Sequence, residues 1–189
     1  MNITHKYINM NKNKPGSIYF GEKIDNKSSS EYFFLSPYYV SPFKIKEMSY
    51  PTVLHFYYAT KFESFKQIYE KIMYAGSALE VFKIAKNFSM IYKQSQASKQ
   101  WKSIRIEVMK LGVTEKFIQN PSLFNKLKST GNIILVYIHG TSRLWGASLP
   151  QSQNIFGKLL MEIRETICFP KNKAILDQFN RTNYKKNVV

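Results

Sequence analysis

The sequence predicts a mainly α-helical protein with a minor α+β component, folded as a single domain. Apolar residues recur at helical spacing over residues 53–73, 99–111 and 155–163. Helix-start signals support this pattern: Ser77-x-x-Glu80 forms a capping box, and Asn120-Pro121 places an N-cap before a first-turn proline. By contrast, only residues 133–138 read clearly as a β-strand. We therefore expect a helical bundle with a few short strands.

Length and composition suit one globular domain with polar ends. The chain has 189 residues, of which 44% are hydrophobic and 15% aromatic, so it is not a disordered chain. Residues 1–30 are rich in Asn, Lys and Ser, and we expect a loose arm with one short strand at residues 18–20. Residues 169–189 form a polar tail after Phe169-Pro170. The folded domain is expected over residues 31–168.

In chain order, the first helix is expected to run without a break from Val53 to Met73 and to end at Ala75-Gly76. A capped helix follows Ser77. The helix at 99–111 would place Trp101, Ile104, Val108 and Met109 inward. On the last helix Asn154, Lys158 and Met161 share one face, which is either a solvated face or a binding face.

The formal net charge of +16 raises the question of nucleic acid. Lys, Asn, Ile, Tyr and Phe are all abundant, a bias that an AT-rich coding sequence produces, and no RGG tract, Cys/His finger or basic heptad region is present. We expect nonspecific polyanion binding at low salt as a side effect of charge. A function in nucleic-acid binding is kept as the weakest alternative.

Cysteine content and hydropathy set further limits. The single Cys168 excludes a disulfide framework and a Cys-based metal site, so we expect no metal and no cofactor. No signal sequence and no run of about 18 apolar residues is evident, so we expect a cytoplasmic protein without a membrane partner.

Three blocks of sequence resemble the YbiA-like proteins, also called NADAR domains. The first is FLSPYYVSPFKIKEMSYPTVLHFYYATKF at 34–62, and the second is the weaker block from Trp101 to Phe117. The third is WG followed by N-x-x-G-K-x-L-M-x-x-R, which begins at Trp145. The blocks occur in the family's order and together cover about residues 31–168.

This resemblance implies both a fold and an activity. The fold would be a YbiA-like orthogonal helical bundle with short strands. The activity would be that of an N-glycosidase, which hydrolyses the N-glycosidic bond of phosphorylated ribosylamino-pyrimidines, the early riboflavin intermediates, or of ADP-ribosyl or NAD-related compounds. Such a cleft needs aromatic walls for a flat base and cationic groups for phosphate.

The resemblance also implies a set of ligand-binding residues, and each member has a structural alternative. Tryptophans can form a wall or the core, lysines can bind phosphate or be solvated, Asn154 can bind a ligand or cap its helix, and His55 and Arg164 can be structural. The expected ligand-binding set is His55, Lys61, Trp101, Trp145, Gly146, Asn154, Lys158 and Arg164.

The chain departs from the family pattern at its acids, and this leaves the catalytic residues unknown. Neutral residues occupy the positions where the family has carboxylates: Leu54, Gln100, Tyr137 and Ser142. Because a positioned acid or base contributes roughly 10²–10⁴ in rate, two alternatives follow. Either another acid, such as Glu47, Glu63 or Glu107, has taken over, or the chain is a pseudoenzyme that binds a phosphorylated nucleoside or ADP-ribosyl ligand.

Overall fold

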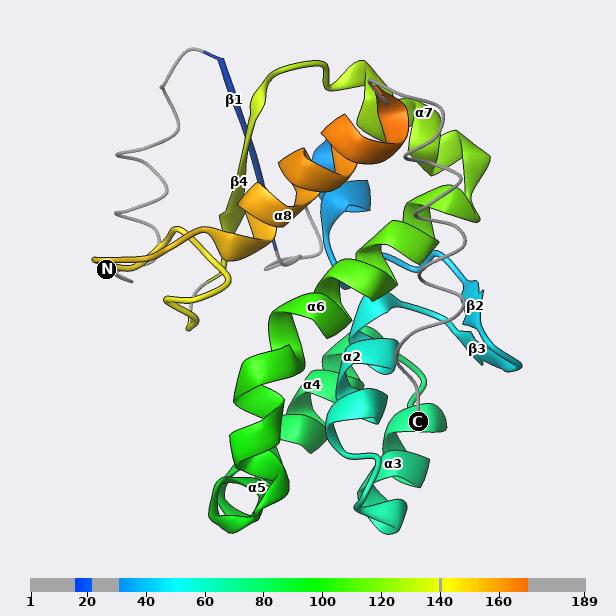
Figure 1. Cartoon of the computed structure of the whole chain (residues 1–189), viewed down its shortest axis with the longest axis vertical. Helices are drawn as coiled ribbons and strands as arrows, with labels where there is room; N and C mark the ends of the chain where they lie inside the picture. The colour runs from blue at the N-terminus through cyan, green and yellow to red at the C-terminus, as the bar shows by residue number, and fades with distance from the viewer. Residues whose placement is uncertain (1–15, 22–30, 140, 170–189) are drawn as a thin grey trace. The chain divides into compact units, whose positions relative to one another are not determined.

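The computed structural model describes residues 16–21, 31–139 and 141–169 (Figure 1). Most of the expected N-terminal arm and nearly all of the C-terminal tail lie outside these ranges. The contacts divide the chain into two compact units. We call Phe20–Leu123 the helical unit, and Phe124–Val189 together with Met1–Tyr19 the strand-helix unit. Each unit is described by itself.

The helical unit is built around the helix α2, Val53–Lys61. Thr52 caps this helix by accepting a hydrogen bond from the backbone N–H of His55, and six of the nine helical residues are buried. Around α2 pack α3, α4 and α6. The remaining elements of the unit, in order, are η1 (Glu31–Leu35), β2 (Phe43–Ile45), β3 (Met48–Tyr50), α3 (Lys66–Met73), α4 (Ala78–Asn87), α5 (Ser89–Gln94) and α6 (Ala97–Ile118).

The expected single helix over residues 53–73 is wrong, because the chain turns between α2 and α3. Hydrogen bonds of the i→i−3 type form the turn: the N–H of Glu63 donates to the carbonyl of Thr60, and that of Phe65 to the carbonyl of Phe62. Phe62 and Phe65 both pack against Tyr92, with ring centroids 5.1 and 5.8 Å away. Tertiary packing therefore overrides the helical periodicity here.

The later helices follow the expected starts more closely than the expected ends. The Ser77 hydroxyl accepts a hydrogen bond from the N–H of Glu80, which confirms the capping-box start of α4. The helix expected at 99–111 extends over Ala97–Ile118. Trp101 and Met109 are buried as expected, but Ile104 is 39% exposed, so its inward assignment is wrong. The short helix α5 was not anticipated.

Two strands of the helical unit form an antiparallel hairpin. Phe43 pairs with Tyr50 and Ile45 with Met48, and Lys46 takes a positive φ of 53° in the turn. The rings of Phe43 and Tyr50 both contact Phe56 of α2, at 6.2 and 5.2 Å between centroids. The hairpin thus closes one side of the α2 core.

The strand-helix unit places a helix against a two-stranded sheet. β4 (Ile134–Ile138) confirms the strand expected at 133–138, and it pairs with β1 (Ser17–Gly21). α8 (Ile155–Ile163) packs on β4 and continues as a π-helical turn, Arg164–Cys168 (Figure 1). α7 (Pro121–Ser129) begins at the proline that the sequence indicated. The mainly helical fold class with few short strands is confirmed.

Candidate functional site

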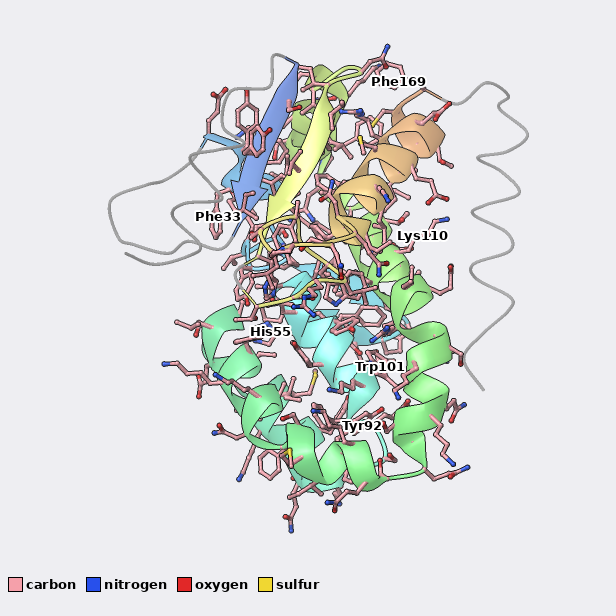
Figure 2. All side chains as sticks on the ribbon, turned by 90° about the vertical axis from the view of Figure 1, so that its left-hand side faces the viewer. Phe33, His55, Tyr92, Trp101, Lys110 and Phe169 are labelled. Carbon is pink, nitrogen blue, oxygen red and sulfur yellow. The ribbon has the colours of Figure 1, made fainter. Side chains whose placement is uncertain are left out.

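One pocket of the helical unit lies where the end of α2 approaches α5 and α6. Its volume is about 330 Å³. The turn that interrupts the expected long helix supplies Glu63 and Ser64, and the end of α2 supplies Thr60 and Lys61. The lining consists of Thr60, Lys61, Glu63, Ser64, Tyr92, Ala97, Gln100, Trp101 and Ile104. Figure 2 labels Tyr92 and Trp101 at this end of the helical unit, and His55 on α2. Two residues expected to bind ligand, Lys61 and Trp101, therefore line the same pocket.

Lys61 is the half-buried cation of this pocket. Its Nζ lies 4.6 Å from the ring centroid of Tyr92 and 4.8 Å from that of Phe62. Burial, together with the smaller effect of the charges of Lys93 and Arg105, lowers the pKa of Lys61 to about 8. In such surroundings the ammonium form of Lys61 loses its proton more readily than an exposed lysine does, and while it is charged it attracts an anion more strongly.

Trp101 and Tyr92 form the aromatic side of the pocket. Trp101 is only 7% exposed, and its ring makes an edge-to-face contact with Tyr57 at 4.9 Å between centroids. Most of the indole is therefore core, as the structural alternative proposed, while the remainder lines the pocket. The Tyr92 hydroxyl donates to the carbonyl of Ala97 at 3.2 Å, which holds its ring in place beside Lys61.

Leu54, Tyr137 and Gln100 are neutral residues at positions where the resemblance implies an acid, and the structure places them in different surroundings. Leu54 is 5% exposed and Tyr137 1% exposed, so both are core residues of their units. Gln100 lines the pocket. Among the residues that line the pocket, Glu63 is the one carboxylate. It was one of three relocated acids that the sequence suggested.

His55 is held by two local hydrogen bonds rather than aimed into the pocket. Its Nδ1 accepts from the Thr52 hydroxyl at 2.8 Å, and its Nε2–H donates to the carbonyl of Ala75 at 3.1 Å. Burial lowers the pKa of His55, which keeps the ring neutral at physiological pH. This geometry supports the structural alternative for His55.

In the strand-helix unit, Asn154 joins the start of α8 to β4. Its Oδ1 accepts from the N–H of Tyr137 and its Nδ2 donates to the carbonyl of Leu135, both at 3.0 Å. Asn154 has a φ of +50°, and its side chain does not cap its own helix. Gly157 brings α8 so close that a Cβ there would collide with the Leu135 carbonyl. Asn154 therefore satisfies strand backbone groups, a role that neither sequence alternative included.

The Trp145-Gly146 loop packs against the end of β4. The Ser142 hydroxyl accepts from the N–H of Trp145 at 3.1 Å, so the side chain of Ser142 shapes this turn. A Cβ on Gly146 would lie 2.7 Å from the Cβ of His139, which explains the glycine. Trp145 is half-buried.

Lys158 and Arg164 differ in environment although both lie on the last helical stretch. Lys158 is exposed. Arg164 is 6% exposed, and its Nη1 donates to the Thr130 hydroxyl at 2.7 Å. This contact supports the structural role for Arg164, with a hydroxyl as its partner rather than a carboxylate.

Sequence reasoning missed three basic residues. Lys93 and Arg105 lie outside its ligand set, yet both act on Lys61, and Lys116 is a fully buried lysine. Two of them carried a signal, since Arg105 and Lys116 both lie in the second family block, Trp101 to Phe117. Across the described residues, no group of three or more His, Cys, Asp or Glu side chains is arranged to hold a metal ion. Nor does any helix in these ranges have the length and apolar character needed to cross a membrane.

Comparisons with known proteins agree with the motif blocks. A riboflavin biosynthesis protein of Vibrio vulnificus is 31% identical over 151 residues, which is 79% of this chain and 38% of the relative. A chloroplastic riboflavin biosynthesis protein of Zea mays is 30% identical over 125 residues, 63% of this chain and 20% of the relative. The chain thus spans well under half the length of these two proteins.

A shorter relative matches over nearly its whole length. The N-glycosidase YbiA of Escherichia coli is 27% identical over 145 residues, 76% of this chain and 87% of the relative. The NMR structure of the E. coli protein YbiA superposes with a TM-score of 0.64 at 21% identity, covering 93% of this chain and 95% of that one. This likeness confirms the expected single-domain, YbiA-like fold. The family model described as the NADAR domain matches residues 20–168. The chain therefore belongs to the NADAR domain family.

Proposed function

We propose that this protein is an N-glycosidase that uses Lys61 as its nucleophile. Its substrate would be a phosphorylated ribosylamino-pyrimidine or a related ADP-ribosyl compound. The observation that carries the proposal is the position of Lys61: a partly desolvated amine lines a pocket beside the Trp101 indole and the Glu63 carboxylate. Desolvation and neighbouring cations are two ways by which proteins activate a lysine. The relatives named as an N-glycosidase and as riboflavin biosynthesis proteins support the substrate class.

The chemistry can be followed atom by atom. At a pKa of about 8, roughly a fifth of the amine is neutral at pH 7.4. The neutral Nζ of Lys61 forms a bond to the anomeric carbon of the ribose while the bond from that carbon to the pyrimidine amino nitrogen breaks. As the new bond forms, Nζ becomes a secondary ammonium, and the Glu63 carboxylate takes one of its protons and passes it to the departing nitrogen. The lone pair left on Nζ then expels the ring oxygen, which takes a proton from a water molecule, so that the sugar opens to an iminium on Lys61. The hydroxide that remains adds to the iminium carbon, and the adduct collapses to the free sugar phosphate and the neutral lysine.

This route needs none of the acids that the resemblance implies. A carboxylate at the position of Leu54 or Ser142 would stabilise the positive sugar or activate a water molecule. When the lysine nitrogen forms a covalent bond to the anomeric carbon, it donates electrons to that carbon, so the sugar carries less positive charge. A single group that carries a proton from Nζ to the departing nitrogen then suffices, and Glu63 is the carboxylate that lines the pocket.

A trapping experiment tests the proposal. The protein is incubated with a ribosylamino-pyrimidine phosphate in the presence of borohydride, and peptides are analysed by mass spectrometry. We expect base release, and a reduced sugar adduct on Lys61. Lys61→Gln should lose both, while Lys66→Gln, which removes an exposed lysine outside the pocket, should keep both. Base release without an adduct would leave a glycosidase with a different nucleophile; no release from either substrate class would overturn the activity.

A second function has its own observation. Leu54 and Tyr137, at two positions where the resemblance implies an acid, are packed into the cores of their units. A pocket with Lys61, Lys93 and Arg105 near it and few acids would still bind a phosphorylated nucleoside or ADP-ribosyl ligand. Calorimetric binding of such a ligand, with no base released at equimolar protein, would identify a pseudoenzyme.

A further inference from the structure

Two basic residues next to the pocket are not explained by the proposed chemistry. Lys93 follows Tyr92 on α5, and Arg105 follows Ile104 on α6, and both Tyr92 and Ile104 line the pocket. Both charges are close enough to lower the pKa of Lys61. Three cations therefore gather around one small pocket whose lining holds a single carboxylate.

Arg105 is partly withdrawn from water without a partner for its inner nitrogen. It is half-buried, and its Nε is buried with no hydrogen-bond partner among the described residues. A buried N–H without an acceptor is unfavourable by about 1–3 kcal/mol, so an arrangement of this kind is normally completed by an acceptor from outside. Arg105 also falls at i+4 from Trp101, which places it on the same side of α6 as the pocket lining.

The crowding of like charges points to the same missing component. Lys61, Lys93 and Arg105 repel one another, and this repulsion is relieved only when an anion enters. A phosphate dianion offers several acceptor oxygens, and a guanidinium can bind two of them at once. Lys93 is exposed, and so can reach an anion at the mouth of the pocket.

We propose that Lys93 and Arg105 form a phosphate subsite beside the Lys61 pocket, one that holds the phosphoryl group of the substrate. The inference rests on the proposed function for the identity of the substrate, but not for the binding of the anion. It assigns the discrimination between phosphorylated and dephosphorylated ligands to α5 and α6.

Binding of an anion at Lys93 and Arg105 should be coupled to protonation of Lys61. A bound dianion offsets the charges that hold the pKa of Lys61 down, so the pKa rises and the amine takes up a proton. Binding of sulfate, which itself carries no proton at neutral or alkaline pH, should therefore be accompanied by proton uptake near pH 8. Simple surface attraction to scattered lysines would not produce this uptake.

The first test uses sulfate and needs no catalysis. Sulfate binding is measured by calorimetry at pH 8 in two buffers of different ionisation enthalpy, for wild type, Lys93→Gln, Arg105→Gln and Lys102→Gln. Lys102 is exposed on the same helix and lies outside the pocket lining, so it is a matched charge control. We expect affinity to fall at least fivefold in the first two variants and less than twofold in the third, with proton uptake in wild type. An equal fall in all three, or no uptake, would overturn the subsite.

The second test separates the subsite from the activity. The ratio of kcat/KM for a phosphorylated over a dephosphorylated ribosylamino-pyrimidine should drop about tenfold in Arg105→Gln and Lys93→Gln, and stay constant in Lys102→Gln. An unchanged ratio in Lys93→Gln, an exposed substitution that the fold tolerates, would overturn the subsite while the glycosidase stands. If the wild-type protein cleaves nothing but these variants lose sulfate binding, the subsite stands and the proposed glycosidase activity is overturned.

Discussion

The Nζ of Lys116 donates a hydrogen bond of 2.7 Å to the backbone carbonyl of Phe34, joining α6 to η1 across 82 residues of sequence. A second hydrogen bond, of 2.9 Å, reaches the carbonyl of Ser36. The rings of Tyr39 and Phe117 flank the nitrogen at 5.4 and 5.2 Å. Lys116 therefore holds in place the FLS segment that precedes α2.

Burial makes this contact dependent on pH. It lowers the pKa of Lys116 from an ordinary value of 10.5 to about 7. Between these two values the unfolded chain binds a proton that the folded chain does not, so the free energy of unfolding rises with pH in that window. The neutral amine still has two N–H groups for the two carbonyls, and therefore the contact survives deprotonation.

We accordingly predict that the free energy of unfolding of wild type rises from pH 7 to pH 9 relative to that of Lys116→Met. The slope of the difference should approach, at most, about 1.4 kcal/mol per pH unit. At pH 7 the variant should also lose stability from its two unsatisfied carbonyls, about 1–3 kcal/mol each where they are fully buried. Urea unfolding at several pH values measures both effects. Lys99→Met, at an exposed position of α6, is the control; a wild-type slope equal to that of Lys116→Met would contradict the prediction.

A second prediction concerns the contact between α2 and α6. A Cβ on Gly112 would lie 2.6 Å from Cδ1 of Phe56, whose side chain is buried. Gly112→Ala should therefore destabilise the protein by about 1–3 kcal/mol despite the higher helix propensity of alanine. Gly76→Ala is the matched control, because its Cβ would meet only Glu80 Oε2 at 3.6 Å. Thermal unfolding that ranks the two variants equally would show that Phe56 can move aside.

The elements that the sequence predicted correctly are those with local causes. The start of α4 at Ser77, the start of α7 at Pro121 and the strand β4 follow from capping, proline geometry and β-branched composition. The break after Lys61 was missed because it depends on the packing of Phe62 and Phe65 against Tyr92, more than 25 residues later. Local periodicity contains no information on that contact.

The candidate site divides in the same way. Lys61 and Trp101 were found because motif blocks carry them, and they line one pocket. Lys93 was missed because an exposed lysine on a helix looks the same in sequence whether or not a pocket adjoins it. Arg105 lies within the second motif block but was not included in the expected ligand-binding set. The role of Asn154 was missed for a related reason, since its partners lie on β4, 17 and 19 residues away.

Asn154 allows its structural and ligand roles to be separated. Asn154→Gly removes the two strand hydrogen bonds but tolerates the φ of +50°. Asn154→Ala removes the same bonds and adds backbone strain of about 1–2 kcal/mol. We expect both variants to be destabilised in chemical unfolding, with alanine the worse by about that strain. If Asn154 acts only on a ligand, KM would change in both variants while the free energy of unfolding would not.

The last prediction uses the pH dependence of Lys61 to test its role as nucleophile. Because the reactive form is the neutral amine, kcat/KM for a dephosphorylated substrate should rise with pH and level off above an apparent pKa of about 8. Lys93 and Arg105 both lower that pKa, so Lys93→Gln or Arg105→Gln should move the rising limb to higher pH, whereas Lys102→Gln should leave it in place. A dephosphorylated substrate avoids confusion with loss of the phosphate contact. If the limb stays at the same pH in every variant, the titrating group is not Lys61, and Glu63 or a residue outside the pocket must set the rate.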